Sequence, residues 1–224
     1  MSADLIISYD GTANDDDALA LGKMLAKTGA TLALAYVRHS HEFDPRREQL
    51  AQHDAEQRLE RGATRLSAGE VARHVVVGAS TGTVLGELAV REGAKAVVFG
   101  SDYRTTPGRA EPGTSAQRML EGGTVAVAVA AAGLRLKADE SITTIAVPFA
   151  GPVNDDARAT AEALAEKLGA TVIDPGAKEV DLIIVGSVQS APAGHVVVGG
   201  DVRNELSSAR SSVLILPAQT RLNF

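Results

Sequence analysis

Apolar and polar positions alternate in a regular series along the first 133 residues. Short runs rich in Val, Ile, Leu and Ala predict buried strands at 5–8, 31–37, 74–77, 96–99 and 124–130. Stretches with helical spacing separate them, at 14–27, 45–67, 83–92 and 114–120. The second of these is polar and carries charges of both signs, so we expect a solvated helix face there. Strict alternation of strand and helix predicts an α/β fold with a parallel sheet.

An internal repeat relates the two ends of the chain. Residues 10–16 match residues 150–156 at an offset of 140. Further along, Gly100-Ser101 recurs as Gly186-Ser187 at an offset of 86. The difference of 54 residues corresponds to the second helix, the third strand and the third helix of the first copy. The second copy therefore lacks these three elements.

The repeat predicts a complete domain at 1–133, a polar linker at 134–141 and a truncated copy at 142–224. The loss is structurally reasonable if the first sheet is Rossmann-like with the order 3-2-1-4-5, because the third strand then lies at an edge. Its removal leaves a sheet of order 2-1-4-5 with an intact centre. The removal also bares an apolar face of that sheet, which the first domain or a second subunit must cover.

The composition excludes several classes of protein. Hydrophobic residues make up 45% and aromatic residues 3%, without Trp, so the core consists mainly of Ala, Val, Leu and Ile. Such a core suits buried parallel strands and does not suit modules that stack nucleic-acid bases on aromatic rings. The absence of Cys excludes disulfides and thiolate metal sites, and a net charge of −6 argues against a general polyanion binder. Without a signal peptide or a membrane-length apolar run, we expect a cytoplasmic protein with no nucleic-acid or membrane partner.

The loop at 100–113 carries the most informative chemistry. It leaves the carboxyl end of a central strand and enters a helix whose free N–H groups, with the hydroxyls of Thr114 and Ser115, form an anion site. Arg104 and Arg109 add positive charge in the same loop. The residues alone leave two interpretations equally open, a phosphate site and a plain strand-to-helix loop.

The spacing of Gly100 and, thirteen positions later, Gly113-Thr114 resembles the nucleotide loop of the universal stress protein family. The acidic Asp10 after the first strand and the order of the elements also fit that family. The resemblance covers nearly the whole chain, as a tandem with a truncated second copy. It implies a Rossmann-like sheet of five parallel strands, and ATP or another adenine nucleotide as the ligand, alone or with Mg²⁺.

Carried over by position, the resemblance implies a nucleotide site in the first copy. Residues 8–10 would flank the adenosine, the backbone of Val37 would meet the adenine, and residues 113–115 would hold the phosphates. The family's second loop glycine falls on Tyr103, whose bulky side chain either blocks the backbone from phosphate or packs on the nucleotide. The expected nucleotide-binding residues are Ser8, Tyr9, Asp10, Val37, Gly100, Ser101, Tyr103, Arg104, Arg109, Gly113, Thr114 and Ser115.

The second copy lacks much of this chemistry. Ala150 replaces Asp10, Gly200 replaces Thr114, and Asp201 follows where a phosphate would lie, so we expect this copy not to bind nucleotide. The acidic run at 14–17 nevertheless recurs at 154–156. Its persistence in a copy without the binding chemistry favours a helix N-cap over a metal site.

The last strands of both copies, 124–130 and 212–216, are edges in the predicted order, and exposed apolar edges tend to pair. In the family that the chain resembles, last strands commonly meet across a dimer axis. We therefore expect an intramolecular pseudo-dimer with antiparallel last strands, with a homodimer left open. The expected contact places Val125, Val127 and Val129 beside Val213, Leu214 and Ile215.

These patterns lead to three functional interpretations. The first is a regulator or sensor that binds ATP and is not a fast enzyme. The second is a nucleotide-free assembly protein of the same fold, which Tyr103 favours. The third is a serine hydrolase, because residues 78–82 match the Gly-x-Ser-x-Gly pattern around Ser80. Against it, His195 is the only His that follows Ser80, and a helix cap at Ser80 or Thr81 explains the same residues.

Overall fold

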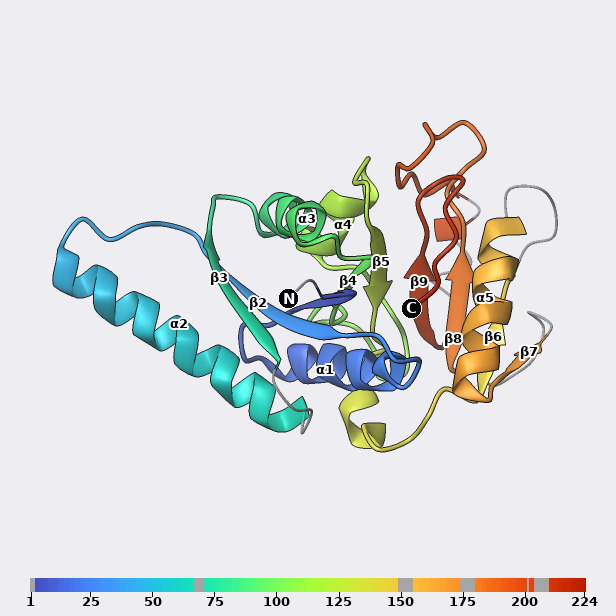
Figure 1. Ribbon diagram of the computed structural model, residues 1–224, viewed down its shortest axis with the longest axis horizontal. Coiled ribbons are helices and arrows are strands. Elements are labelled where there is room, and N and C mark those ends of the chain that lie inside the picture. The colour runs from blue at the N-terminus through green and yellow to red at the C-terminus, as the bar shows by residue number, and fades with distance from the viewer. Residues whose placement is uncertain (1–2, 67–70, 149–154, 174–179, 201, 204–209) are drawn as a thin grey trace.

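The computed structural model describes residues 3–66, 71–148, 155–173, 180–200, 202–203 and 210–224. These residues build one sheet of nine strands in the order β3-β2-β1-β4-β5-β9-β8-β6-β7 (Figure 1). The strands are β1 (Leu5–Ser8), β2 (Leu32–Arg38), β3 (Ala72–Val77), β4 (Ala96–Phe99), β5 (Ala126–Val129), β6 (Thr144–Ala146), β7 (Thr171–Ile173), β8 (Leu182–Val185) and β9 (Ser212–Ile215). The helices are α1 (Ala13–Ala26), α2 (Pro45–Leu66), α3 (Thr81–Glu92), α4 (Thr114–Leu120) and α5 (Asp155–Leu168), with a 3₁₀ helix, η1 (Leu134–Lys137).

The strand order confirms both predicted sheets. The first half has the order β3-β2-β1-β4-β5, which is 3-2-1-4-5, and the second half has the order β7-β6-β8-β9, which is 2-1-4-5. All pairs within each half are parallel. The two halves join through β5 and β9, which run antiparallel with Val127 opposite Ile215 and Val129 opposite Val213. The predicted pairing of the last strands is therefore present within one chain.

Helices cover the two faces of the sheet separately. Along β1, Leu5 and Ile7 face α1 and α2, whereas Ile6 faces the opposite side, where α3 and α4 lie (Figure 1). The core residues of α5 belong to the same cluster as those of α1. Central strands are apolar on both faces because both faces are buried, which explains why the sequence shows continuous apolar runs without alternation.

In the truncated half, the apolar face of β8 and β9 is covered by described residues of both halves. Val196 and Val198, from the connection between β8 and β9, pack against β8 and β9 in the same cluster as α4 residues of the first half. Two backbone hydrogen bonds hold this connection to the turn after α4, from Val196 N to Gly123 O (2.7 Å) and from Gly122 N to Val196 O (2.9 Å). The cover expected from the first half is thus present, and the chain's own connection adds to it.

The segment expected to be a linker packs against α1. Asp17 is fully buried, accepts hydrogen bonds from Gly133 N and Arg135 N, and pairs with the Arg135 side chain at 2.9 Å. An exposed ion pair between Lys23 and Asp139 adds a second attachment further along α1. A buried carboxylate needs such partners, and the residues that supply them lie in η1 and at its start.

The second half repeats hydrogen bonds of the first half at the offset found in the sequence. Ser101 Oγ donates to Ala130 O at 2.6 Å, and Ser187 Oγ, 86 residues later, donates to Leu216 O at 2.7 Å. The N–H group ten residues after each serine donates back to that serine, at 3.2 and 3.1 Å. The loops after β4 and β8 therefore share one hydrogen-bonded frame.

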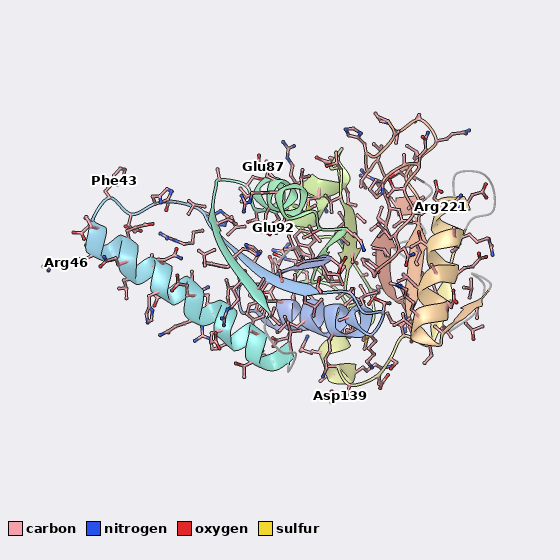
Figure 2. The ribbon with its side chains drawn as sticks, viewed as in Figure 1. Phe43, Arg46, Glu87, Glu92, Asp139 and Arg221 are labelled. Atoms are coloured by element: carbon pink, nitrogen blue, oxygen red, sulfur yellow. The ribbon has the colours of Figure 1, made fainter. Side chains whose placement is uncertain are left out.

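The long helix α2 extends beyond the sheet at its N-terminal end. Phe43, just before α2, is fully exposed, and Figure 2 shows Phe43 and Arg46 far from the rest of the molecule. The first turn of α2 is held to β2 by the buried Arg38, which pairs with Glu48 at 2.6 Å. This hydrogen-bonded guanidinium lowers the pKa of Glu48 to about 2.

Candidate functional site

A cleft of about 610 Å³ opens at the carboxyl ends of β1, β2 and β4. This is the switch point of the first half, where β1 has neighbours reached by crossovers in opposite directions, and open parallel sheets bind ligands at such points. Its volume lies within the usual range of small-molecule sites. Most of the residues predicted from the sequence line it, namely Ser8, Tyr9, Asp10, Val37, Gly100, Ser101, Tyr103, Gly113, Thr114 and Ser115.

The two predicted arginines are not among the described residues that line the cleft. The Arg104 guanidinium lies over the exposed Tyr103 ring, 4.8 Å from its centroid. Arg109 is partly buried, and its backbone carbonyl accepts a hydrogen bond from Ala132 N at 2.8 Å. At Arg109 the loop is thus hydrogen-bonded to the segment that follows β5.

Tyr9 contributes to the cleft differently from the expectation. Its side chain is buried in the core below α2, where an added Cβ on Gly62 would lie only 2.9 Å from Tyr9 Cε1. Burial raises the pKa of the Tyr9 phenol. The residue follows β1 directly, and its ring belongs to the core on the face of the sheet that α1 and α2 cover.

A carboxylate pair forms one corner of the cleft. Asp15 Oδ2 accepts hydrogen bonds from Asp10 N (3.1 Å), Thr12 N (2.9 Å) and Thr12 Oγ1 (2.7 Å), and Thr12 N also approaches Asp10 Oδ1 at 3.2 Å. Burial, the hydrogen bond with Asp10 and the negative charge of Asp10 raise the pKa of Asp15 to about 7. Near neutral pH, Asp15 therefore holds a proton for part of the time.

The acidic run at 14–17 serves the helix and its neighbours. Thr12 is the N-cap of α1, and it forms a capping box with Asp15. Asp16 pairs with Arg65 of α2, and Asp17 pairs with Arg135. The cap interpretation is confirmed, with the N-cap two residues earlier than Asn14. Among the residues that the structure describes, no group of three or more His, Asp or Glu side chains is arranged to hold a metal ion.

Gly100 has a packing role at the floor of the cleft. A Cβ added there would overlap the backbone carbonyl oxygen of Asn14 in the first turn of α1. The Asn14 side chain also donates from Nδ2 to Ser101 O at 2.8 Å. The start of α1 and the end of β4 are therefore in direct contact, and the contact requires a residue without a side chain.

Several residues that line the cleft were not among those predicted from the sequence, and Asp102, Tyr36 and Arg58 are three of them. Arg58 comes from α2, donates from Nη1 to Asp10 O at 3.2 Å, and lies 5.2 Å from the centroid of the Tyr36 ring. It belongs to the helix that we expected to present only a solvated face. The available signal was weak, because nothing local marks the one arginine of that helix that reaches the ends of the strands.

Ser80 is the N-cap of α3. Its Oγ accepts from Thr83 N at 3.5 Å, and its backbone is extended with φ −127° and ψ 111°. His195 lies in the β8–β9 connection of the other half, with Nδ1 3.1 Å from Ala193 O. Gly82, the last glycine of the pattern, lets α3 approach Ser115 O of α4. The residues of the hydrolase pattern thus have structural roles, as the cap interpretation predicts.

The counterparts of the site in the second half are only partly visible. Gly186 and Ser187 keep the frame of the loop. Ala150, Asn154 and Asp201 lie outside the described residues, so the expectation that this half does not bind nucleotide stays a prediction. Of the helices that the structure describes, none is long and apolar enough to cross a membrane.

Comparison with known proteins agrees with this architecture. The model of the universal stress protein family matches residues 1–131. A universal stress protein from Archaeoglobus fulgidus DSM 4304 superposes with a TM-score of 0.60 at 13% identity, covering 97% of this chain and 99% of that one. A functionally unknown protein from Pseudomonas aeruginosa PAO1 gives a TM-score of 0.61 at 13% identity, covering 97% and 93%. At such identities the likeness concerns the fold, and no curated protein matches the chain.

Proposed function

The chain belongs to the universal stress protein family, and from that premise we propose that it is a cytoplasmic regulator that binds an adenine nucleotide, in the first instance ATP. The observation that carries the proposal is the convergence of three separate segments on one cleft. Asp10 follows β1, Val37 lies near the carboxyl end of β2, and residues 113–115 lie at the start of α4. A cleft of about 610 Å³ at the switch point of a parallel sheet suits a ligand of nucleotide size.

Each group would have a defined part in binding. The exposed Asp10 carboxylate would accept hydrogen bonds from ribose hydroxyls, and the main chain at Val37 would meet the base. At the start of α4, Gly113 makes no side-chain cap, so the first N–H groups of the helix and the hydroxyls of Thr114 and Ser115 would face the phosphates. Mg²⁺, when present, would be held mainly by the phosphates, because the described residues form no metal cluster there.

The proposed role is sensing, without rapid turnover. No Lys is among the described residues that line the cleft. The Asp15 carboxylate at its corner is committed to the cap of α1, where it accepts three hydrogen bonds. A site of this kind binds a nucleotide without the positioned cation and base that fast phosphoryl transfer needs.

We further propose that the chain consists of a binding domain at 1–133 and a truncated domain at 142–224 that does not bind nucleotide. The truncated half would complete the sheet by pairing β9 with β5. Because this pairing occupies both last-strand edges, a homodimer would have to use a different surface.

A nucleotide-free assembly protein of the same fold is the second candidate. Tyr103 favours it, because this exposed side chain lines the cleft at a position where the family has a glycine. On this alternative, the nine-stranded sheet and its joined halves would be the functional feature, and the cleft would stay empty.

Nucleotide content decides between the two candidates. The purified protein is denatured by heat and the released small molecules are separated by chromatography, while calorimetry with ATP, ADP and AMP measures binding to protein freed of ligand. The proposal expects either co-purified adenine nucleotide or saturable binding with a stoichiometry of one per chain. Absence of both would leave the assembly interpretation standing and remove the binding function.

A further inference from the structure

Asp102 places a carboxylate at the end of the cleft where α4 begins. It lies in the loop after β4, two residues beyond Gly100, and it is partly buried. An ideal Cβ on Gly113, the N-cap of α4, would lie 3.9 Å from Asp102 Oδ2. The loop holds this position firmly, because Asp102 N donates to Glu111 O at 2.8 Å and Asp102 Oδ1 accepts from Arg104 N at 3.0 Å.

The charges around the cleft are unbalanced in favour of carboxylates. Asp10, Asp15 and Asp102 line it, whereas the basic residues among the described lining residues are Arg58 and His39. Arg58 is already engaged with Asp10 O and the Tyr36 ring. A free polyphosphate in this cleft would carry several negative charges close to these carboxylates, and at short range in a partly buried site such repulsion is strong.

The second half shows what the same position looks like without a charge. Val188 occupies the place of Asp102 at the offset of 86, and its Cγ1 lies 2.6 Å from an ideal Cβ on Gly199, the counterpart of Gly113. The two positions therefore stand over equivalent glycines. Packing over the glycine can be satisfied by an apolar side chain, so the carboxylate of the first half is not required by the frame of the loop.

We propose that Asp102 determines which ligands the cleft accepts, by disfavouring metal-free polyphosphate relative to the nucleoside. This inference rests on the proposed nucleotide binding and deepens it. The cleft then takes adenosine or a nucleotide of low charge directly, and it takes ATP when a divalent cation offsets the phosphate charge. The charge of Asp102 acts on the phosphates, at the end of the cleft where α4 begins. It does not change the contacts that the cleft makes with the base and the ribose.

Calorimetry with adenosine and ATP, each in EDTA and in excess Mg²⁺, tests this preference. For the wild-type chain in EDTA, adenosine binds more tightly than ATP. Excess Mg²⁺ reduces the difference between the two affinities. Asp102→Asn keeps the acceptor for Arg104 N and removes the charge, so it strengthens ATP binding in EDTA by about tenfold and changes adenosine binding by less than about twofold. Asp102→Val, which copies the second half, gives the same direction.

Glu111→Gln is the matched control, because Glu111 lies in the same loop and lines a neighbouring cavity that Asp102 also borders, but Glu111 does not line the cleft. It leaves both affinities unchanged. Metal-free ATP binding more tightly than adenosine to the wild-type chain, or an equal change of both ligands in Asp102→Asn, overturns the role of Asp102. A wild-type chain that binds neither ligand overturns the proposed function itself, and with it this inference.

Discussion

Gly100 and Asn14 touch backbone to backbone where β4 ends and α1 begins. Any Cβ at position 100 would overlap the Asn14 carbonyl oxygen, and the Asn14 side chain donates to Ser101 O at 2.8 Å. The family resemblance implies that Gly100 lets the ligand approach the backbone. The structure gives Gly100 a packing role as well. It sets how closely the first turn of α1 lies to the floor of the cleft.

Gly100→Ala should lower the free energy of unfolding by about 1–3 kcal/mol, because the backbone must shift to admit a methyl group. Urea unfolding followed by circular dichroism measures the change. Gly86→Ala serves as the control. Gly86 lies inside α3 with only Met119 Cε near its Cβ position, at 3.9 Å, so alanine should stabilise the helix by about 0.5–1 kcal/mol. Equal stability of Gly100→Ala and the wild type would contradict the contact.

Asp10→Ala and Thr114→Gly should each weaken ATP binding by about 1–3 kcal/mol, because each removes a hydrogen-bonding group from the proposed site. Both residues are exposed, so neither change should unfold the protein. Calorimetry in Mg²⁺ measures the affinities. Unchanged affinity in both variants would remove the assignment of these residues. Ser80→Ala, outside the cleft, is expected to leave binding as it is.

The raised pKa of Asp15 predicts a specific pH dependence. In the folded chain Asp15 titrates near about 7, against an ordinary value of 3.8, so the folded state holds the extra proton between these values. Because the folded state binds this proton more tightly than the unfolded state does, the proton stabilises the fold. The stabilisation is complete below pH 3.8 and is lost as the pH rises to about 7. The slope is at most about 1.4 kcal/mol per pH unit.

Comparison with Asp15→Asn isolates this contribution from that of the other carboxylates. From about pH 8 to about pH 5, the free energy of unfolding of the wild type should rise relative to that of the variant. A difference that does not change with pH would show that Asp15 titrates normally.

Loss of the Arg135 side chain should destabilise the fold by about 3 kcal/mol, because the fully buried Asp17 would lose the guanidinium that pairs with it. Adding Asp17→Ala to Arg135→Ala should recover part of the loss, and the second half already has Ala157 at this position. Thermal unfolding of the single and double variants measures the coupling.

The control for this pair is Arg221→Ala. Arg221 stands 86 residues after Arg135 and pairs with Asp156 of α5, and the Arg221 side chain is exposed (Figure 2). Its loss should cost less than about 1 kcal/mol. If Arg135→Ala and Arg221→Ala lowered the stability of the protein by similar amounts, the burial of Asp17 would have no energetic consequence.

Val127→Lys should destabilise the protein by several kcal/mol and expose apolar surface, because Val127 is fully buried opposite Ile215 where β5 meets β9. Thr124→Lys, at an exposed position just before β5, provides the comparison and should leave stability nearly unchanged. Binding of a hydrophobic dye and the melting temperature report the effect. Native melting of Val127→Lys would contradict the joined sheet.

The sequence by itself determined the order of the elements, and together with the family resemblance it indicated the strand order of both halves. Buried parallel strands are continuous apolar runs, and a repeat with a gap shows which elements the second copy lacks. The pairing of β5 with β9 also followed, because two apolar edges in one chain need partners and the resembled family joins its last strands. These features depend on local pattern and on edge burial, which a sequence records directly.

Only the tertiary structure decided which side chains reach the cleft. Arg104 lies over Tyr103 and Arg109 folds toward the end of β5, although both belong to the loop that carries the site. Arg58 reaches the cleft from a helix distant in sequence, and Asp102 stands over Gly113 because the loop closes on itself. Side-chain direction depends on loop closure and on how α2 lies against the sheet, and no local pattern along the chain encodes either of these.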